Sequence, residues 1–166
     1  HPWISTASRS ATTGRLASGG TWRRDGETRL IVATDTRRLL EQLQRPLAAD
    51  NPRLGIVLAA GHGKRIRSAT SKMLHEIWGR PTVQRVADAV AKGVESPNQV
   101  IVVGIKGEEV ARTLDAREGR SFAYQESPVL GLPGGTGDAV RVALEQFDSG
   151  DRTVYVFPGD MGLLTQ

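Results

Sequence analysis

The chain has 166 residues, no cysteine and a formal net charge of +4, with 39% hydrophobic and 24% charged residues. This length suits one domain with a real core, and the absence of thiols excludes disulfides, thiolate zinc sites and cysteine nucleophiles and is compatible with a reducing cytoplasm. No apolar run approaches membrane-spanning length, and the basic excess lacks the interleaved aromatic residues of a nucleic-acid surface, so we expect neither a membrane nor a nucleic acid as partner.

The first part of the chain divides into two stretches. Residues 1–28 are rich in Ser, Thr, Gly and Arg without a helical or strand period, and we expect poor order there. Residues 29–53 predict a βα unit that is either a local extension packed on the main domain or the tail of an upstream domain. Because the first residue is His1 and not Met, we expect the chain to be a piece of a longer protein.

Within this βα unit, the apolar run 30–33 predicts a strand, and residues 37–43 predict an amphipathic helix that ends near Pro46. Asp35 or Thr36 is the expected cap of that helix, because a short side-chain oxygen can accept from the free N–H groups of a first turn.

A second apolar run, residues 54–60, is rich in β-branched residues and predicts a buried parallel strand. Gly61 and Gly63 follow it and let backbone N–H groups face a ligand. Four cations then occur within nine positions: Lys64, Arg65, Arg67 and Lys72. This composition is typical of a loop that binds a polyphosphate.

Two well-known phosphate loops fail on spacing. A Walker loop needs Gly five positions before its Gly-Lys pair, where this chain has Leu58, and it needs Ser or Thr where this chain has Arg65. A dinucleotide fingerprint needs a third Gly at the position of Ile66.

The rest of the chain alternates helices and strands. Pro81 opens a helix with apolar residues at helical spacing. The expected strands are 99–104, 121–125 and 153–157, and the other expected helices are 108–114 and 137–146. This alternation predicts an α/β, Rossmann-like fold with a mostly parallel sheet covered on both faces. Ligands of such sheets bind beyond the carboxyl ends of the strands, where the cationic loop, Gln125 and Asp160 are expected to converge.

The letters LAAGHGKRI (58–66) followed by SKMLH (71–75) resemble the signature of the sugar-1-phosphate nucleotidyltransferases, L-A-A-G-x-G-T-R-M and then P-K-x-L. The closing Leu-His resembles the uridyltransferase branch, in particular the N-terminal domain of the bifunctional N-acetylglucosamine-1-phosphate uridyltransferases. The chain departs from the pattern at Lys64, Ile66 and Ser71. The resemblance implies a nucleotide-diphospho-sugar transferase (GT-A-like) fold, of which residues 54–166 would be the nucleotide-binding first half, truncated before the sugar-binding part.

Two later motifs extend the resemblance. The segment 125–139 looks like the family's Q-x(n)-L-G-T-G-x-A with a longer loop, which implies that Gln125, Gly135 and Thr136 read the edge of uracil. An amide suits that role because it offers both a donor and an acceptor to an imide. The letters GDMGLL (159–164) resemble G-D-x-P-L-(L/I), with Gly162 in place of Pro, and imply that Asp160 binds Mg²⁺.

The resemblance implies transfer of a uridylyl group from UTP to a sugar 1-phosphate, with N-acetylglucosamine 1-phosphate as the expected acceptor, giving a UDP-sugar for cell wall precursors in the cytoplasm. We expect the fragment alone to be inactive. A nucleotidyltransferase specific for CTP, GTP or dTTP, or a non-catalytic nucleotide-binding regulatory domain, remains an alternative. The implied catalytic residues are Arg65 and Lys72, and the implied nucleotide contacts are Leu58, Ala59, Ala60, Gly61, Gly63 and Lys72.

Overall fold

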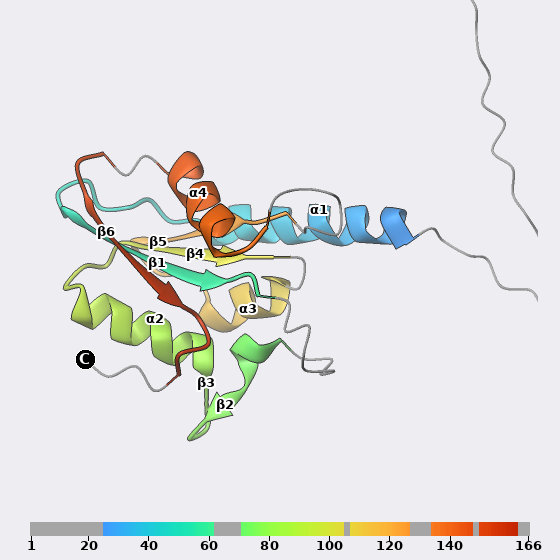
Figure 1. The fold of residues 1–166 in the computed structure, drawn as a ribbon, viewed down its shortest axis with the longest axis horizontal. Coiled ribbons are helices and arrows are strands. Elements are labelled where there is room, and N and C mark those ends of the chain that lie inside the picture. Colours follow the sequence, from blue (N-terminus) through green and yellow to red (C-terminus); the bar gives the residue numbers. More distant parts are fainter. Residues whose placement is uncertain (1–24, 62–70, 105–106, 127–133, 148–149, 163–166) are drawn as a thin grey trace, which may run out of the picture.

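The computed structural model describes residues 25–61, 71–104, 107–126, 134–147 and 150–162 (Figure 1). Each strand and helix expected after residue 53 is confirmed and begins within one residue of its predicted start. The elements are, in chain order, α1 (Asp25–Leu43), β1 (Arg53–Ala59), the 3₁₀ helix η1 (Lys72–Leu74), β2 (Glu76–Ile77), β3 (Arg80–Pro81), α2 (Thr82–Gly93), β4 (Gln99–Val103), α3 (Gly107–Leu114), β5 (Arg120–Tyr124), α4 (Thr136–Gln146) and β6 (Thr153–Pro158).

The strand expected at residues 30–33 is wrong, because these residues lie inside α1. A four-residue apolar run does not distinguish a strand from a helix, and here neither Gly nor Pro occurs from Glu27 to Leu43 to interrupt the helix. Asp35 and Thr36 therefore lie within α1 instead of capping it, and Thr36 is fully buried. The first four residues of α1 belong to the stretch 1–28 in which poor order was expected. The rest of that stretch lies outside the described residues.

The carboxyl-terminal half of α1 packs on the domain. Leu39 and Leu40 join the core, and the side chain of Gln44 bonds both backbone groups of Phe122 in β5, donating to the carbonyl at 2.8 Å and accepting from the N–H at 2.9 Å. An amide side chain thus covers the open edge of β5, as a neighbouring strand would. Such packing is expected of a local extension, and the division of the chain into domains stays a prediction.

The sheet has the order β5-β4-β1-β6, and all of its strands are parallel. Ile56 in the middle of β1 lies opposite Val100 of β4 and Val156 of β6, which fixes the register. The chain proceeds from β1 outward to β4 and β5, and then returns through α4 to β6 on the other side of β1. The order therefore reverses between β1 and β6, and the carboxyl ends of parallel strands at such a reversal are where α/β sheets bind ligands.

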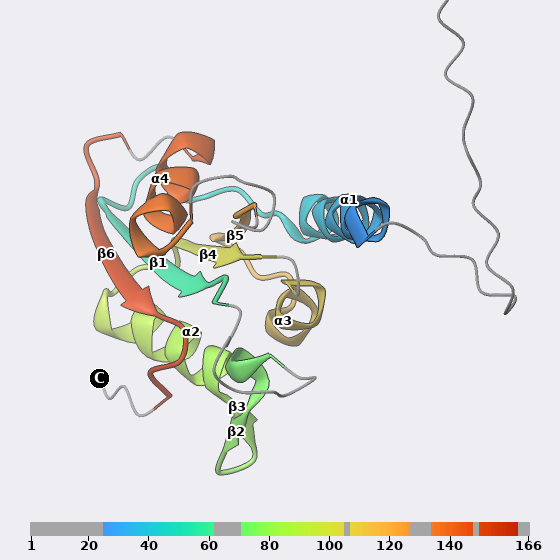
Figure 2. The same cartoon turned by 45° about the vertical axis from the view of Figure 1, so that its right-hand side comes forward.

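Helices cover both faces of this sheet (Figures 1 and 2). Val57, Ile101 and Phe122 point to the face covered by α1, α2 and α3, and Ile56 and Val102 point to the face covered by α4. Alternation of apolar side chains along buried parallel strands produces these two cores. None of the helices in the described ranges is both long enough and apolar enough to span a bilayer.

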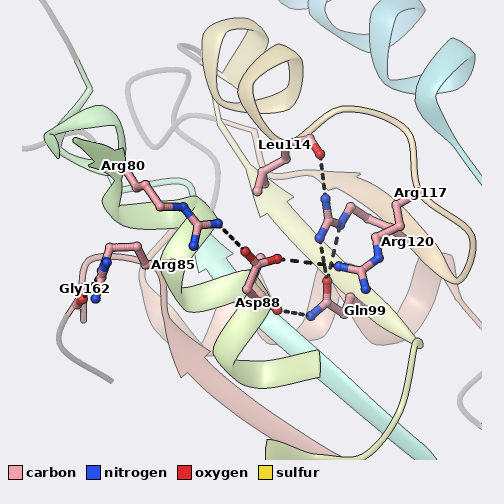
Figure 3. Close-up of polar contacts among 9 residues, drawn as sticks. Arg80, Arg85, Asp88, Gln99, Leu114, Arg117, Arg120 and Gly162 are labelled. Carbon is pink, nitrogen blue, oxygen red and sulfur yellow. Dashed lines mark hydrogen bonds and ion pairs between the residues drawn. The ribbon is translucent and has the colours of Figure 1, made fainter. Parts of the chain in front are cut away.

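The amino ends of β4 and β5 carry a buried polar group that we name the amino-end cluster: Gln99 and Arg120 with the backbone oxygens of Ala87 and Leu114 (Figure 3). The Arg120 guanidinium donates to Gln99 Oε1 at 3.1 and 3.2 Å and to the Leu114 carbonyl at 2.6 Å, and Gln99 donates to the Ala87 carbonyl. Burial lowers the pKa of Arg120, because it disfavours the charged guanidinium. The hydrogen-bond acceptors offset this desolvation of the charge. The cluster ties α2 and α3 to the sheet.

Candidate functional site

The ends of β1 and β6 meet at the carboxyl edge of the sheet. Gly159 donates its N–H to the carbonyl of Leu58 at 2.9 Å, one step beyond the end of β6. A Cβ at Gly159 would lie 2.9 Å from that carbonyl oxygen and 3.0 Å from Met73 Sδ, so this approach requires a glycine. Leu58 and Ala60 are half-buried and Ala59 is buried, and the site is built on these last residues of β1 and the residue that follows them.

The short helix η1 packs against this edge through Met73. This side chain is buried, and a Cβ added at Gly159 would lie 3.0 Å from its sulfur and one added at Gly61 would lie 3.7 Å from its terminal methyl. Lys72, the first residue of η1, is half-buried beside Met73, whereas Gly61 and Asp160 are exposed. The structure therefore brings Gly61, Lys72 and Asp160, expected at one site, to the same edge around one methionine.

Ser71 occupies the position of the proline in the family pattern. Its backbone has φ −59° and ψ 139°, which proline also adopts, and its Oγ accepts from the N–H of Met73 at 3.4 Å. The serine therefore keeps the extended backbone before Lys72 and adds a cap to η1.

Asp160 lies in a turn that is fixed on both sides. Beyond it, Gly162 accepts a hydrogen bond from Arg85 Nε at 3.0 Å (Figure 3), and a Cβ at Gly162 would lie 2.6 Å from Ile77 Cδ1 and 2.9 Å from Thr82 Cγ2. Ile77 belongs to the hairpin formed by the antiparallel strands β2 and β3. Close packing against this hairpin and α2 thus requires the glycine that replaces the family proline. Arg85 also stacks over the exposed ring of Trp78 at 5.0 Å, between the hairpin tip and the turn.

The donor set at this edge is compatible with a hydrated metal ion. No group of three or more His, Cys, Asp or Glu side chains that could hold a metal occurs among the described residues. Asp160 is an exposed carboxylate in a turn at the end of a strand. One carboxylate fits Mg²⁺, which keeps several waters and takes its other ligands from phosphate oxygens.

The second part of the site lies at the end of β5. Gln125 is buried, its N–H donates to Val103 at 2.8 Å, and its Nε2 donates to the carbonyl of Gly135 at 3.0 Å. Gly135, with φ +95°, is the N-cap of α4, and exposed Thr136 begins that helix. The structure therefore brings together Gln125, Gly135 and Thr136, although their roles remain predictions.

Sequence reasoning missed Asp138, whose Oδ2 accepts from Gln125 Nε2 at 2.8 Å. Its Oδ1 accepts from Arg141 at 2.6 and 3.2 Å, and these bonds, that from Gln125 first, lower the pKa of Asp138. The spacing of Asp138 and Arg141 in the first turns of a helix was a readable signal. The contact with Gln125 was not, because a loop separates the two residues.

Two predicted residues, Gly63 and Arg65, lie outside the described residues, as do Lys64 and Arg67. The loop 127–133, where the chain is longer than the family pattern, lies outside them as well. The site as described consists of Leu58, Ala59, Ala60, Gly61, Lys72, Gln125, Gly135, Thr136 and Asp160, which we name the carboxyl-edge site.

Comparisons with known proteins agree on one family. A sequence model described as "MobA-like NTP transferase domain" matches residues 55–166. The chain is 39% identical over 106 residues to the bifunctional protein GlmU of Caldicellulosiruptor saccharolyticus, covering 64% of this chain and 22% of that protein. The GlmU protein of Streptomyces griseus is 40% identical over 120 residues, covering 72% and 24%. The chain thus spans about a quarter of the length of these relatives.

A solved structure shows the same fold. The crystal structure of Rv0371c from Mycobacterium tuberculosis H37Rv superposes with a TM-score of 0.54 at 22% sequence identity, over 71% of this chain and 57% of that chain. Identity at this level shows the α/β fold alone.

Proposed function

Because the chain belongs to the family of MobA-like NTP transferase domains, we propose that its carboxyl-edge site binds UTP and that it forms the nucleotide-binding part of a uridylyltransferase acting on a sugar 1-phosphate. The family match covers residues 55–166 and supports nucleotidyl transfer as the class of reaction. The choice of UTP and of N-acetylglucosamine 1-phosphate rests on the motif resemblance, and so does the cytoplasmic location in which both substrates would be met.

One observation carries this proposal: the buried side chain of Met73 in η1 reaches the glycines that follow β1 and β6. Met73 lies near both Gly61 and Gly159, so a cation, an exposed glycine backbone and a carboxylate from three separate segments share one edge. A polyphosphate needs this combination, because its oxygens are neutralised by a lysine and a metal ion while backbone N–H groups position it. The reversal of strand order between β1 and β6 is the expected place for such a ligand.

The reaction needs no protein nucleophile. An oxygen of the sugar phosphate attacks the α-phosphorus of UTP in line, the bond to the β-phosphate oxygen breaks, and pyrophosphate leaves. Lys72 neutralises charge on the phosphates, and Gly61 offers its backbone to them at an exposed position. From the motif resemblance we assign Gly63 to backbone contacts with the phosphates, like Gly61, and Arg65 to neutralisation of phosphate charge, like Lys72. The residues therefore act by positioning and charge compensation.

Asp160 is the residue that would hold Mg²⁺. Its carboxylate is exposed at the strand end, and its turn is fixed by the packing of Gly159 and Gly162, so a ligand oxygen is presented with little loss of backbone freedom. The ion would supply neutralisation of the negative charge on the phosphates.

Calorimetric titration of this chain with UTP, CTP and GTP, with and without Mg²⁺, tests the proposal. We expect UTP to bind more tightly than CTP and GTP, and Mg²⁺ to strengthen the binding. Equal binding of the three nucleotides would contradict the uracil specificity and favour a nucleotidyltransferase of other specificity. No binding by a chain shown to be folded by circular dichroism would contradict the proposal as a whole.

A matched pair of variants tests the metal assignment. Asp160→Asn removes the carboxylate charge at the carboxyl edge and should abolish the strengthening of UTP binding by Mg²⁺. Asp151→Asn makes the same change at an exposed position just before β6, at the opposite end of that strand, and should leave the strengthening intact. An equal effect of both variants would show a general effect of charge and would remove Asp160 from the metal site.

A further inference from the structure

The amide of Gln125 is held in one orientation. Gln125 is 7% exposed, and its backbone is fixed by the bond to Val103 that extends the β4–β5 ladder. Its Nε2 donates to the carbonyl of Gly135 at 3.0 Å and to Asp138 Oδ2 at 2.8 Å. A primary amide carries two N–H hydrogens, so both are used by these two acceptors.

Asp138 can only act as an acceptor in this arrangement. Its side chain is 8% exposed, and Arg141 donates to its other oxygen from Nη2 at 2.6 Å and from Nε at 3.2 Å. The carboxylate also lies in the first turn of α4, where a helix N-terminus favours negative charge. Asp138 is therefore held ionised, which agrees with its lowered pKa.

Reversal of the Gln125 amide would be unfavourable. The reversed side chain would place Oε1 against two acceptors, the Asp138 carboxylate and the Gly135 carbonyl, and would lose both hydrogen bonds. Within the described part of the chain, no hydrogen bond to Oε1 is formed. The orientation therefore leaves an acceptor, and not a donor, for a ligand. In this arrangement the amide offers a base its Oε1 and not the N–H donors of Nε2.

We propose that Asp138 is a specificity-determining residue that positions the Gln125 amide. With Oε1 directed to the base, the site accepts a base that has an N–H facing Oε1 and disfavours a base that has an unprotonated nitrogen facing it. The inference rests on the proposed function, because it requires a nucleotide beside Gln125 and Gly135. Uracil and thymine carry an N–H at ring position 3, whereas cytosine carries an acceptor nitrogen there. Cytosine could meet Oε1 only with its exocyclic amino group, after a shift of the ring along its edge.

The test compares UTP, CTP and dTTP binding to the chain and to Asp138→Asn by calorimetry. The asparagine is nearly isosteric and can donate to Gln125 Oε1, which permits the reversed amide and presents Nε2 to the base. We expect the chain itself to prefer UTP over CTP by about tenfold, which equals about 1.4 kcal/mol. In Asp138→Asn the ratio should fall below about threefold, and dTTP should follow UTP because both share the same imide edge.

A matched control is available on the same helix. Glu145 also pairs with Arg141, but it does not touch Gln125, so Glu145→Gln makes the same chemical change without reaching the amide. The UTP to CTP ratio should be unchanged in this variant. The role of Asp138 would be overturned if Asp138→Asn left the UTP to CTP ratio unchanged, or if both variants lowered that ratio equally. In either case, binding of UTP by the chain itself would leave the proposed function standing. Absence of nucleotide binding by the folded chain would overturn both.

A measurement without substitution covers the case in which Asp138→Asn does not fold. In the chain itself, the side-chain carbonyl carbon of Gln125 should change its NMR chemical shift on addition of UTP, because Oε1 accepts from the base. The two Nε2 protons should keep slow exchange with water before and after addition, because they remain bonded to Asp138 and Gly135. Fast exchange of these protons in the free chain would overturn the proposal.

Discussion

The two ends of the parallel sheet are built in opposite ways. At the amino end, Gln99 and Arg120 are 1% and 4% exposed, and their hydrogen bonds join two strands to two helices. At the carboxyl end, Gly61 and Asp160 are exposed and Lys72 is half-buried. The sheet thus carries buried polar residues at the amino ends of β4 and β5, and solvent-accessible polar groups beyond the carboxyl ends of β1 and β6.

The difference shows how one fold separates stability from ligand binding. Polar groups that satisfy one another in the interior specify how the helices sit on the sheet. Groups at the carboxyl edge are held in place through glycine backbones and Met73, so that their charges remain available to a ligand. Substitutions at the amino end should therefore change the free energy of unfolding, and substitutions at the carboxyl edge should change binding and turnover.

The largest expected effect is at Lys72. In a complete protein, Lys72→Ala should lower turnover by several orders of magnitude, each tenfold costing about 1.4 kcal/mol of transition-state stabilisation, while the melting temperature stays nearly unchanged. Lys92→Ala, at an exposed position in the last turn of α2, is the control and should change neither quantity. A loss of less than tenfold for Lys72→Ala would remove this lysine from the mechanism.

At the amino end, Arg120→Met should destabilise the fold by about 3 kcal/mol, because Gln99 Oε1 and the Leu114 carbonyl lose their buried donors. Methionine fills a similar volume, so the cost is mostly polar. Urea denaturation measures it. Arg117→Met is the matched control, because Arg117 is an exposed side chain whose ion pair with Asp88 spans 3.5 Å and contributes about 0.5 kcal/mol or less.

The nucleotide affinity of the folded Arg120→Met variant should equal that of the unchanged chain. A large loss of affinity at a small cost in stability would show that the two ends of the sheet are coupled, and it would contradict the separation argued above.

Gly162→Ala should combine a smaller effect on stability with an effect on the site. The added methyl would lie 2.6 Å from Ile77 Cδ1 and 2.9 Å from Thr82 Cγ2, and relief of such overpacking costs about 1–3 kcal/mol. Because the turn that carries Asp160 must move, the strengthening of UTP binding by Mg²⁺ should weaken too. Gly137→Ala, at a glycine whose added methyl would meet nothing within 4 Å, is the control. An unchanged melting temperature in Gly162→Ala would contradict the close packing.

The fold could be predicted from the sequence because its signals are local. Alternating apolar runs and helical periods predict the four strands of the parallel sheet and the helices α2, α3 and α4. The short elements η1, β2 and β3 were not predicted, because two or three residues carry no period. The apolar run 30–33 was misread, since a run of four residues fits both a strand and a helix, and the surrounding residues allow α1 to continue through it.

The site could be predicted only in part. Motif spacing brought Gly61, Lys72 and Asp160 to one edge, but nothing local shows that Met73 joins them. The contacts of Gln125 with Asp138 and of Arg85 with Gly162 link residues 13 and 77 positions apart, so they depend on the packing of α4 and α2 and not on any period in the sequence.

The smallest expected effect concerns acid. The pKa of Asp138 is lowered in the folded chain, so the stability that its ionised form contributes is present above the ordinary Asp pKa of about 4 and is lost as the pH falls through the lowered folded value. The difference in melting temperature between the chain and Asp138→Asn should therefore be small and constant from pH 5 to 7, and should shrink below about pH 4. Arg120→Met provides the contrast, because a guanidinium stays charged across this range and its cost should not shrink with acid. A constant difference for Asp138→Asn down to about pH 2 would show that Gln125 and Arg141 do not stabilise the carboxylate.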